Sequence, residues 1–328
     1  MNDLCTTPVA LVQIPPVFLN LEASLSKVET LVEKAAKQGA ALVVFPETWL
    51  PGYPVWLDNA PEAAMWNHPG ARALYRILCD NAPTKDHLLK LARIARKNRI
   101  DLVMGCHEID GNTLYNTMVF CTGDGAGPVV HRKLMPTYNE KLIWGWGDGA
   151  TLNTVPTGAG TIGGLICWEH WMPLARAAMH AKKEAIHVAQ WPSVIELHQM
   201  ASRHYAFEGR CFVLACGTVI SKGEVMEGFA SLDIDAPDAL KMLASIKGDD
   251  DTLVMTGGSA VIGPDAAYVA EPVFENRDIL MADLNLNMIR ESAMVLDTDG
   301  HYARPDVFSL VVNEAPMPSV RFENGNSD

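Results

Sequence analysis

The sequence predicts an α/β protein in which helices cover mixed β-sheets. Apolar strands alternate with amphipathic helices over most of the chain, and such alternation is typical of layered α/β structures. Three strand-like segments near the C-terminus look paired with one another, which indicates mixed sheets and not a purely parallel one. Hydrophobic residues make up 48% of the 328 positions, so the chain can bury a large core.

The first half of the chain contains the clearest elements. Residues 9–14 form a short apolar strand that two prolines end. Asn20 can cap the next helix, in which apolar residues recur at spacings of three and four until Gly39. A continuous apolar strand follows at residues 40–45. The next expected elements are a helix that Thr84 can cap and strands at residues 100–105 and 114–121.

The second half continues the alternation. Strands are expected at residues 161–167, 185–189 and 211–216, helices at 172–182 and 197–208, and the late paired strands at 259–262, 267–270 and 279–284. Residues 236–258 contain an acidic run and are interpreted as a surface insertion. Residues 313–328 are rich in Pro, Asn and Ser and are expected to form a tail. Because no repeat or low-complexity linker interrupts the rest, residues 1–312 are predicted to form one domain.

Charge and cysteine content argue against several classes of protein. The chain has 26 Lys and Arg against 39 Asp and Glu, a net charge of −13, which disfavours binding to nucleic acids or to anionic membranes. No apolar run approaches the roughly 20 residues that a membrane span needs, and the N-terminus does not resemble a secretory signal. Seven widely spread cysteines do not fit a disulfide framework, so a reducing, cytoplasmic location is expected.

Cys167 is the first candidate for a catalytic residue. It ends a strand-like run and precedes a helix that begins near Pro173. A thiol in that position lies near the positive end of a helix dipole, which can lower its pKa and favour the thiolate. The alternative is that Cys167 simply packs in the core, but the Trp, Glu, His and Trp that follow it are unusual for simple packing.

Glu47, Lys133 and Glu140 are further candidates. Glu47 directly follows an apolar strand, at the sheet edge where α/β proteins place their sites, and partial burial would suit it to act as a base. Lys133 can stabilise a developing negative charge, with Glu140 as its counter-ion. The alternative interpretations are a solvated loop glutamate and an ordinary basic strand end.

No cofactor or metal is expected. Residues 158–163 match the G-x-G-x-x-G pattern, but a strand follows where a dinucleotide site needs a helix, so a turn between two strands is the better interpretation. The cysteines and histidines lack the spacing of a zinc site.

Taken together, the order Glu47, Lys133, Cys167 resembles the Glu-Lys-Cys triad of the nitrilase superfamily. The resemblance extends from the first strand to about residue 305 and is specific in three blocks, residues 45–48, 131–134 and 167–170. Further runs resemble the true nitrilase branch, namely residues 51–54, 144–149 and 190–193 together with the Cys-Trp-Glu sequence at residues 167–169.

The resemblance implies a four-layer α-β-β-α sandwich that pairs into a homodimer or a larger homo-oligomer. It also implies hydrolysis of a small nitrile to a carboxylic acid and ammonia through a covalent intermediate on Cys167. In this interpretation Glu47 is the general base, Lys133 donates protons and stabilises charge, and Glu140 supports Lys133. The residues expected to bind the substrate are Tyr53, Trp144, Trp168, Trp191 and His170, and so many aromatic groups favour aryl or arylalkyl nitriles.

Three alternatives remain open from the sequence. An amidase or a cyanide hydrolase would use the same triad. A non-catalytic binding or assembly protein on the same scaffold would not need all three of these residues, so their presence argues against it.

Overall fold

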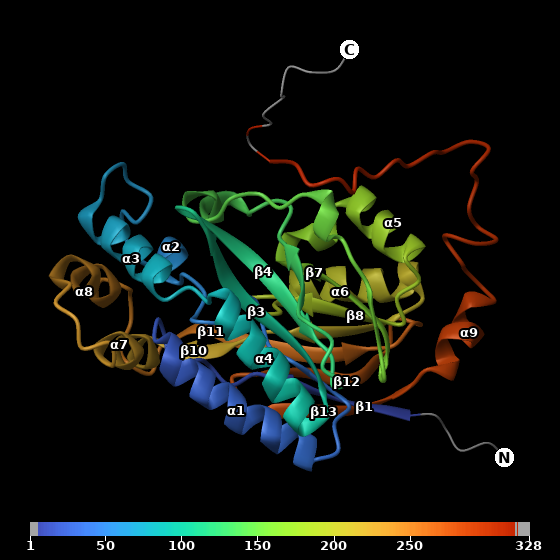
Figure 1. Ribbon diagram of the computed structural model, residues 1–328, viewed down its shortest axis with the longest axis horizontal. Coiled ribbons are helices and arrows are strands. Elements are labelled where there is room, and N and C mark those ends of the chain that lie inside the picture. The colour runs from blue at the N-terminus through green and yellow to red at the C-terminus, as the bar shows by residue number, and fades with distance from the viewer. Residues whose placement is uncertain (1–5, 319, 321–328) are drawn as a thin grey trace.

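Two β-sheets lie face to face, and helices cover the outer face of each (Figure 1). The computed structural model describes residues 6–318 and residue 320. The first sheet has the order β13-β1-β2-β3-β4-β5. Its strands are β1 (Thr6–Val12), β2 (Leu42–Val44), β3 (Asp101–Asp110), β4 (Thr113–Cys121), β5 (Val129–Arg132) and β13 (Ile279–Asn285).

The second sheet has the order β10-β11-β9-β8-β7-β6, and β12 pairs with β11. Its strands are β6 (Val155–Thr157), β7 (Gly160–Ile166), β8 (Ile186–Gln190), β9 (Phe212–Cys216), β10 (Val219–Ser221), β11 (Leu253–Ile262) and β12 (Tyr268–Phe274). Each sheet has three parallel central strands flanked by antiparallel ones. The prediction of mixed sheets is therefore confirmed.

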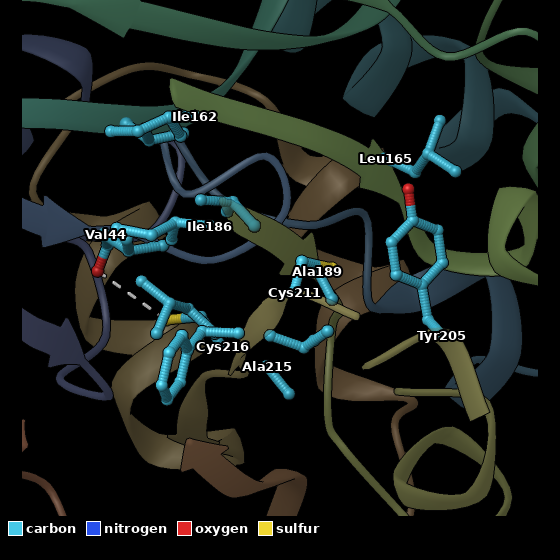
Figure 2. Close-up of a cluster of buried hydrophobic side chains, with 14 of the residues drawn as sticks. Val44, Ile162, Leu165, Ile186, Ala189, Tyr205, Cys211, Ala215 and Cys216 are labelled. Atoms are coloured by element: carbon cyan, nitrogen blue, oxygen red, sulfur yellow. Dashed lines mark hydrogen bonds between the residues drawn. The ribbon is translucent and has the colours of Figure 1, made fainter. Parts of the chain in front are cut away.

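The strands of the first sheet are buried on both faces, which explains why their sequences are continuously apolar. In β1, Val9 and Leu11 point into the core between the sheets, whereas Ala10 and Val12 pack beneath helices α1 (Leu21–Lys37) and α4 (Lys85–Asn98). Figure 2 shows the core between the sheets, where Cys216 Sγ of β9 lies 3.6 Å from the Val44 carbonyl oxygen of β2.

The second sheet is covered by α5 (Pro173–Ala181) and α6 (Glu196–Gly209), which completes the expected four layers. A third cluster of buried side chains lies at one end of the molecule, beneath four helices that the sequence analysis did not identify. They are α2 (Trp56–Asn59), α3 (Pro69–Asp80), α7 (Lys222–Ala230) and α8 (Pro237–Ala244).

Residues 236–258 are more than an external insertion. They contain α8, which buries Ala239, Met242 and Leu243 against the cluster that includes α3, and they also form the start of β11. The longest run of exposed residues in this segment is the acidic turn at residues 247–251. In the sequence, the nearby acidic run made the short apolar face of α8 difficult to recognise.

The late strands pair differently from the expectation. β11 and β12 are antiparallel neighbours, but β13 crosses to the other sheet and pairs with β1. After α9 (Asn287–Ala293), the described chain contains no further helix or strand and runs over the surface towards α5, where Glu314 meets Lys182 at 2.5 Å. None of the described helices is long and apolar enough to cross a membrane.

Candidate active site

The ends of three strands bring Glu47, Lys133 and Cys167 together. Glu47 follows β2, Lys133 follows β5, and Cys167 follows β7 of the opposite sheet. The Cys167 thiol, a carboxylate oxygen of Glu47 and one of Glu140 all lie within 4.8 Å of one another. The site therefore depends on the packing of one sheet on the other.

Lys133 is a buried ammonium held between two carboxylates. Its Nζ donates to Glu47 Oε1 at 2.8 Å and to Glu140 Oε2 at 2.6 Å. Burial alone would lower the pKa of Lys133, but attraction to Cys167, Glu140 and Glu47 outweighs burial and raises it well above its usual value. Lys133 is therefore a fixed positive charge with hydrogen-bond donors at the centre of the site.

Glu47 has one occupied oxygen and one free oxygen. Oε1 accepts hydrogen bonds from Lys133 and from Asn116 Nδ2, the latter at 2.7 Å. Oε2 is buried and has no hydrogen-bond partner among the described residues. Burial raises the pKa of Glu47 to about 7, although the charge of Lys133 opposes this rise. The free oxygen is thus the atom that can accept a proton near neutral pH.

Cys167 has a strained backbone and a protonated side chain. It is a non-glycine residue in the left-handed region, with φ of 54°, at the start of a 3₁₀ turn, Cys167–Trp171. Burial raises the pKa of its thiol well above the usual value, and the Glu47 carboxylate raises it further. The expectation that a helix dipole lowers this pKa is wrong, because the 3₁₀ turn separates Cys167 from α5 and burial dominates.

Glu140 and Glu169 hold the loops around the triad. Glu140 accepts from Tyr53 at 3.0 Å and from the Thr137 backbone N–H at 2.6 Å, in addition to Lys133. The fully buried Glu169 accepts from the backbone N–H groups of Ile166 at 2.6 Å and Leu134 at 2.7 Å. It thereby ties the residue before Cys167 to the residue after Lys133.

A cavity of about 340 Å³ opens at the Cys167 thiol. Among the expected substrate-binding residues, Tyr53 and Trp168 line it, together with Tyr138, His198 and the apolar side chains of Ile195 and Met255. Trp168 and Tyr138 lie at the rim, where their side chains are 44% and 81% exposed. The cavity wall therefore combines apolar and polar side chains, with aromatic groups near its entrance.

The other three expected substrate-binding residues lie behind this wall. Trp144 is buried, packs edge-on against Tyr53, and donates from Nε1 to His107 at 3.0 Å. Trp191 stacks on His170 and on the lining residue His198. His170 is buried and bonds the carbonyl oxygen of Cys167 at 2.7 Å. These three side chains support residues of the site and do not line the cavity.

Sequence reasoning missed Asn116, Glu169 and His198 as parts of the site. Asn116 lies in the middle of β4, where a single polar residue gives no signal of its role. Glu169 belongs to the quoted Cys-Trp-Glu run, and its position two residues after Cys167 was the available signal. His198 is one of ten histidines, and only the fold shows that it faces the cavity.

Glu47, Glu140 and Cys167 are also residue types that ligate metals, and their donor atoms lie close enough to share an ion. Lys133 already places a positive charge against both carboxylates. A divalent cation there would be repelled by the ammonium group, so the arrangement suits acid–base chemistry better than metal binding.

Comparison with known proteins shows the family to which the chain is related. Residues 8–294 match the carbon-nitrogen hydrolase family. An aliphatic nitrilase from Sinorhizobium fredii is 39% identical over 95% of this chain and 97% of its own length. Nitrilase 1 from Arabidopsis thaliana is 36% identical over 97% of this chain and 90% of its own length.

Solved structures support the fold. A carbon-nitrogen hydrolase from Helicobacter pylori superposes with a TM-score of 0.65 at 19% identity, over 92% of this chain and 96% of that one. An amidase from Nesterenkonia sp. gives a TM-score of 0.61 at 17% identity, over 87% of this chain and 92% of that one. The resemblance to the nitrilase superfamily is confirmed, and the chain belongs to the carbon-nitrogen hydrolase family.

Proposed function

We propose that the protein hydrolyses an organic nitrile with two waters to a carboxylic acid and ammonia. Cys167 is the nucleophile, Glu47 the general base, Lys133 the proton donor and charge stabiliser, and Glu140 the residue that supports Lys133. The observation that carries the proposal is the free Oε2 of Glu47 beside a protonated thiol, with Lys133 fixed between two carboxylates. The similarity to curated nitrilases supports the same conclusion.

The first half of the reaction joins the substrate to Cys167. Glu47 takes the thiol proton as Sγ attacks the nitrile carbon, and one C≡N π bond becomes a lone pair on nitrogen. Lys133 stabilises this charge and protonates the nitrogen, then recovers a proton from Glu47. The product is a neutral thioimidate, and both side chains regain their starting protonation.

The second half consumes two waters. Glu47 deprotonates the first water as it adds to the thioimidate carbon and passes that proton to nitrogen, which gives a tetrahedral adduct with one hydroxyl and one amino group. The hydroxyl proton then moves to the nitrogen through Glu47 as the carbon–oxygen double bond forms, and ammonia leaves. The remaining thioester is attacked by a second water, again with Glu47 as base, which releases the acid and restores the thiol. If the carbon–sulfur bond broke before ammonia left, the product would be an amide.

The preferred substrates are aryl or arylalkyl nitriles. Tyr53, Tyr138 and Trp168 present aromatic groups to the cavity, and the rest of its lining combines apolar side chains with polar ones such as Asn59 and Ser193. A cavity of about 340 Å³ is near the small end for ligand sites, which lie at about 300–1,000 Å³. It therefore suits a single ring with a short side chain, stacked against these aromatic groups.

Ammonia release from paired nitriles and amides tests the proposal. The panel contains aryl, arylalkyl and aliphatic nitriles, cyanide, and the matching amides, with Cys167→Ala as the control. We expect release from aromatic nitriles, little from amides, and none with the variant. The name of the Sinorhizobium relative makes preference for aliphatic nitriles the main alternative result on substrate.

Other results would redirect the assignment. Release from amides alone would indicate an amidase, and release from cyanide alone a cyanide hydrolase. If no substrate released ammonia and Cys167 were alkylated no faster than the other cysteines, a non-catalytic binding or assembly role would be favoured.

We further propose a cytoplasmic homo-oligomer. The described cysteines are all unpaired, as expected in a reducing compartment. Helices α5 and α6 expose Leu174, Met200 and Phe207, with exposed fractions of 68%, 56% and 45%, which suits an interface with a second copy.

A further inference from the structure

A chain of buried polar side chains extends from the back of Cys167 into the layer between β8, α5 and α6. His170 Nδ1 lies 2.7 Å from the Cys167 carbonyl oxygen, and His170 Nε2 lies 3.0 Å from His187 Nε2. His187 Nδ1 lies 2.9 Å from Glu184 Oε2. The hydroxyl of Tyr205, a side chain drawn in Figure 2, donates to Glu184 Oε1. The proposed mechanism uses none of the last three residues.

The Cys167 carbonyl fixes the position of every proton in this chain. A carbonyl oxygen only accepts, so His170 Nδ1 must carry a hydrogen. A neutral His170 then has a lone pair on Nε2, and His187 must donate to it from its own Nε2. A neutral His187 therefore has a lone pair on Nδ1, and the facing Oε2 of Glu184 must be the donor.

We propose that Glu184 is a protonated carboxylic acid in the native protein, and that its proton positions Cys167 through His187 and His170. The hydrogen bonds then run in one direction, from Tyr205 and Glu184 through the two imidazoles to the Cys167 carbonyl. Glu184, His187 and His170 are positioning residues, because none of them touches the cavity.

The surroundings of Glu184 favour the neutral acid. Glu184 and both imidazoles are buried, and burial raises the pKa of Glu184 to about 7 while it lowers the pKa of His170 and His187 well below the usual value. Two further titratable groups face Glu184. His180 Nδ1 lies 4.0 Å from Glu184 Oε1, too far for a hydrogen bond, and Cys211 has a buried thiol whose pKa is raised by burial first and by the Glu184 charge second. No guanidinium or ammonium group forms an ion pair with Glu184 among the described residues.

His180 is instead directed towards Glu208. Its Nε2 lies 3.2 Å from Glu208 Oε2, and Arg176 Nε donates to the same oxygen at 2.7 Å. These contacts lower the pKa of Glu208 to about 2 despite partial burial. Glu208 is thus held as a carboxylate by two donors, whereas the hydrogen-bond chain requires Glu184 Oε2 to donate a proton to His187.

The position of the Cys167 carbonyl matters because the backbone there is strained. Cys167 has φ of 54°, and such a conformation persists only when surrounding contacts hold it. The hydrogen bond from His170 is one such contact on the nucleophile's own peptide group. Its consequence for turnover rests on the proposed function, whereas the protonation of Glu184 does not.

Two substitutions of Glu184 test whether its side chain is a neutral acid or a carboxylate. In Glu184→Gln, the amide can still donate to His187 Nδ1 and accept from Tyr205, so we expect alkylation of Cys167 by iodoacetamide at the wild-type rate. In Glu184→Leu the donor is lost and both histidines can change tautomer, so we expect alkylation about tenfold slower, the effect of one lost hydrogen bond. Glu208→Gln is the control for an ionised carboxylate, and it should lower the melting temperature when Glu184→Gln does not.

Spectroscopy can detect the proton on Glu184 directly. Infrared difference spectra of wild type minus Glu184→Gln, recorded below the raised pKa of about 7, should contain the carbonyl stretch of a protonated carboxylic acid, shifted in heavy water. NMR of isotope-labelled imidazole nitrogens should show His187 neutral with its hydrogen on Nε2. A carboxylate band in the difference spectrum, an imidazolium at His187, or Glu184→Gln as impaired as Glu184→Leu would each overturn the proposal. None of these readouts needs nitrile turnover, so failure of the proposed function would leave them interpretable.

Discussion

At the scale of single residues, the chemistry of the site depends on which of three buried groups, Lys133, Cys167 and Glu47, carries a proton. Lys133 carries the positive charge, while Cys167 is held as a thiol. Glu47 is the member of the set whose pKa, raised to about 7, lies in the physiological range. In the proposed mechanism, we therefore expect the thiol proton to move to Glu47 during the attack, without prior formation of a stable thiolate.

The dependence of activity on pH follows from this distribution. A base must be unprotonated, and burial raises the pKa of Glu47 to about 7, so kcat/KM should rise with pH and level off above that value. Below it, we expect a loss of about tenfold per pH unit. The measurement is kcat/KM for an uncharged nitrile across this range. Because Glu184 also has a raised pKa of about 7, the same profile in Glu184→Gln assigns the step to Glu47, and a flat wild-type profile would contradict it.

We expect Glu169 to stabilise the folded protein as well as to hold the loops of the site. In Glu169→Gln, the amide nitrogen would face one of the backbone N–H groups of Ile166 and Leu134, so a buried donor would lose its acceptor. His131 Nε2, which lies 3.0 and 3.2 Å from the two carboxylate oxygens, would keep only its contact with the remaining oxygen. We expect a decrease of about 1–3 kcal/mol in the free energy of unfolding, measured in urea, because a buried donor is left unsatisfied. The exposed Glu271→Gln is the control, and a loss as small as the control's would show that Glu169 is dispensable.

At the scale of elements, Gly105 of β3 allows the loop of Glu47 to approach the sheet. A Cβ at this position would lie 2.0 Å from the Pro46 carbonyl oxygen and 2.9 Å from Glu47 Cα, and both atoms belong to backbone. We therefore expect Gly105→Ala to displace Glu47 and to lower kcat about a hundredfold. Gly127→Ala, in a turn with no atom within 4 Å of the added methyl group, is the control. Equal kcat values in the two variants would contradict this role.

Helix α8 offers a test of whether residues 236–258 belong to the core. Leu243 is fully buried and Leu240, on the same helix, is 44% exposed. Leu243→Ala should lower the free energy of unfolding by about 2–5 kcal/mol, whereas Leu240→Ala should change it by less than about 0.5 kcal/mol. Chemical denaturation of both variants is the measurement. A surface insertion would tolerate the two substitutions equally.

Elements with strong periodicity could be predicted from the sequence, and weakly patterned ones could not. The helix after Asn20 and the strand before Glu47 repeat apolar residues regularly over their lengths. Helices α7 and α8 have only eight or nine residues, with few buried positions and charges nearby. Strand β13 was located correctly, but its partner depends on a crossing between sheets that no local pattern records.

The candidate site could also be predicted only in part from the sequence. Glu47 and Cys167 each follow an apolar strand that the sequence indicates, so both could be placed at strand ends. That these ends belong to two different sheets packed on each other could not be predicted. Whether an aromatic residue faces a cavity depends on tertiary packing, so Trp168 could not be distinguished from the buried Trp191. Glu184 precedes β8 and His187 lies within it, and the contact between the two side chains leaves no recognisable pattern in the sequence.

At the scale of the whole molecule, we expect association through the outer face of α5 and α6. Introducing charge there, as in Leu174→Glu combined with Met200→Glu, should oppose burial of these exposed side chains and yield a smaller species. Sedimentation velocity measures the change. Leu89→Glu, on α4 of the opposite outer layer and 36% exposed, is the control. A wild-type monomer, or a double variant of unchanged size, would contradict this interface.

The pairing of β13 with β1 has a consequence for synthesis of the protein. Residues 6–12 leave the ribosome early, but the strand that covers their outer edge lies at residues 279–285. Throughout most of translation the nascent chain therefore carries an unpaired, apolar strand edge, which is a template for aggregation. Chaperones that shield this edge should raise the yield of folded protein, and truncation before residue 279 should abolish that benefit.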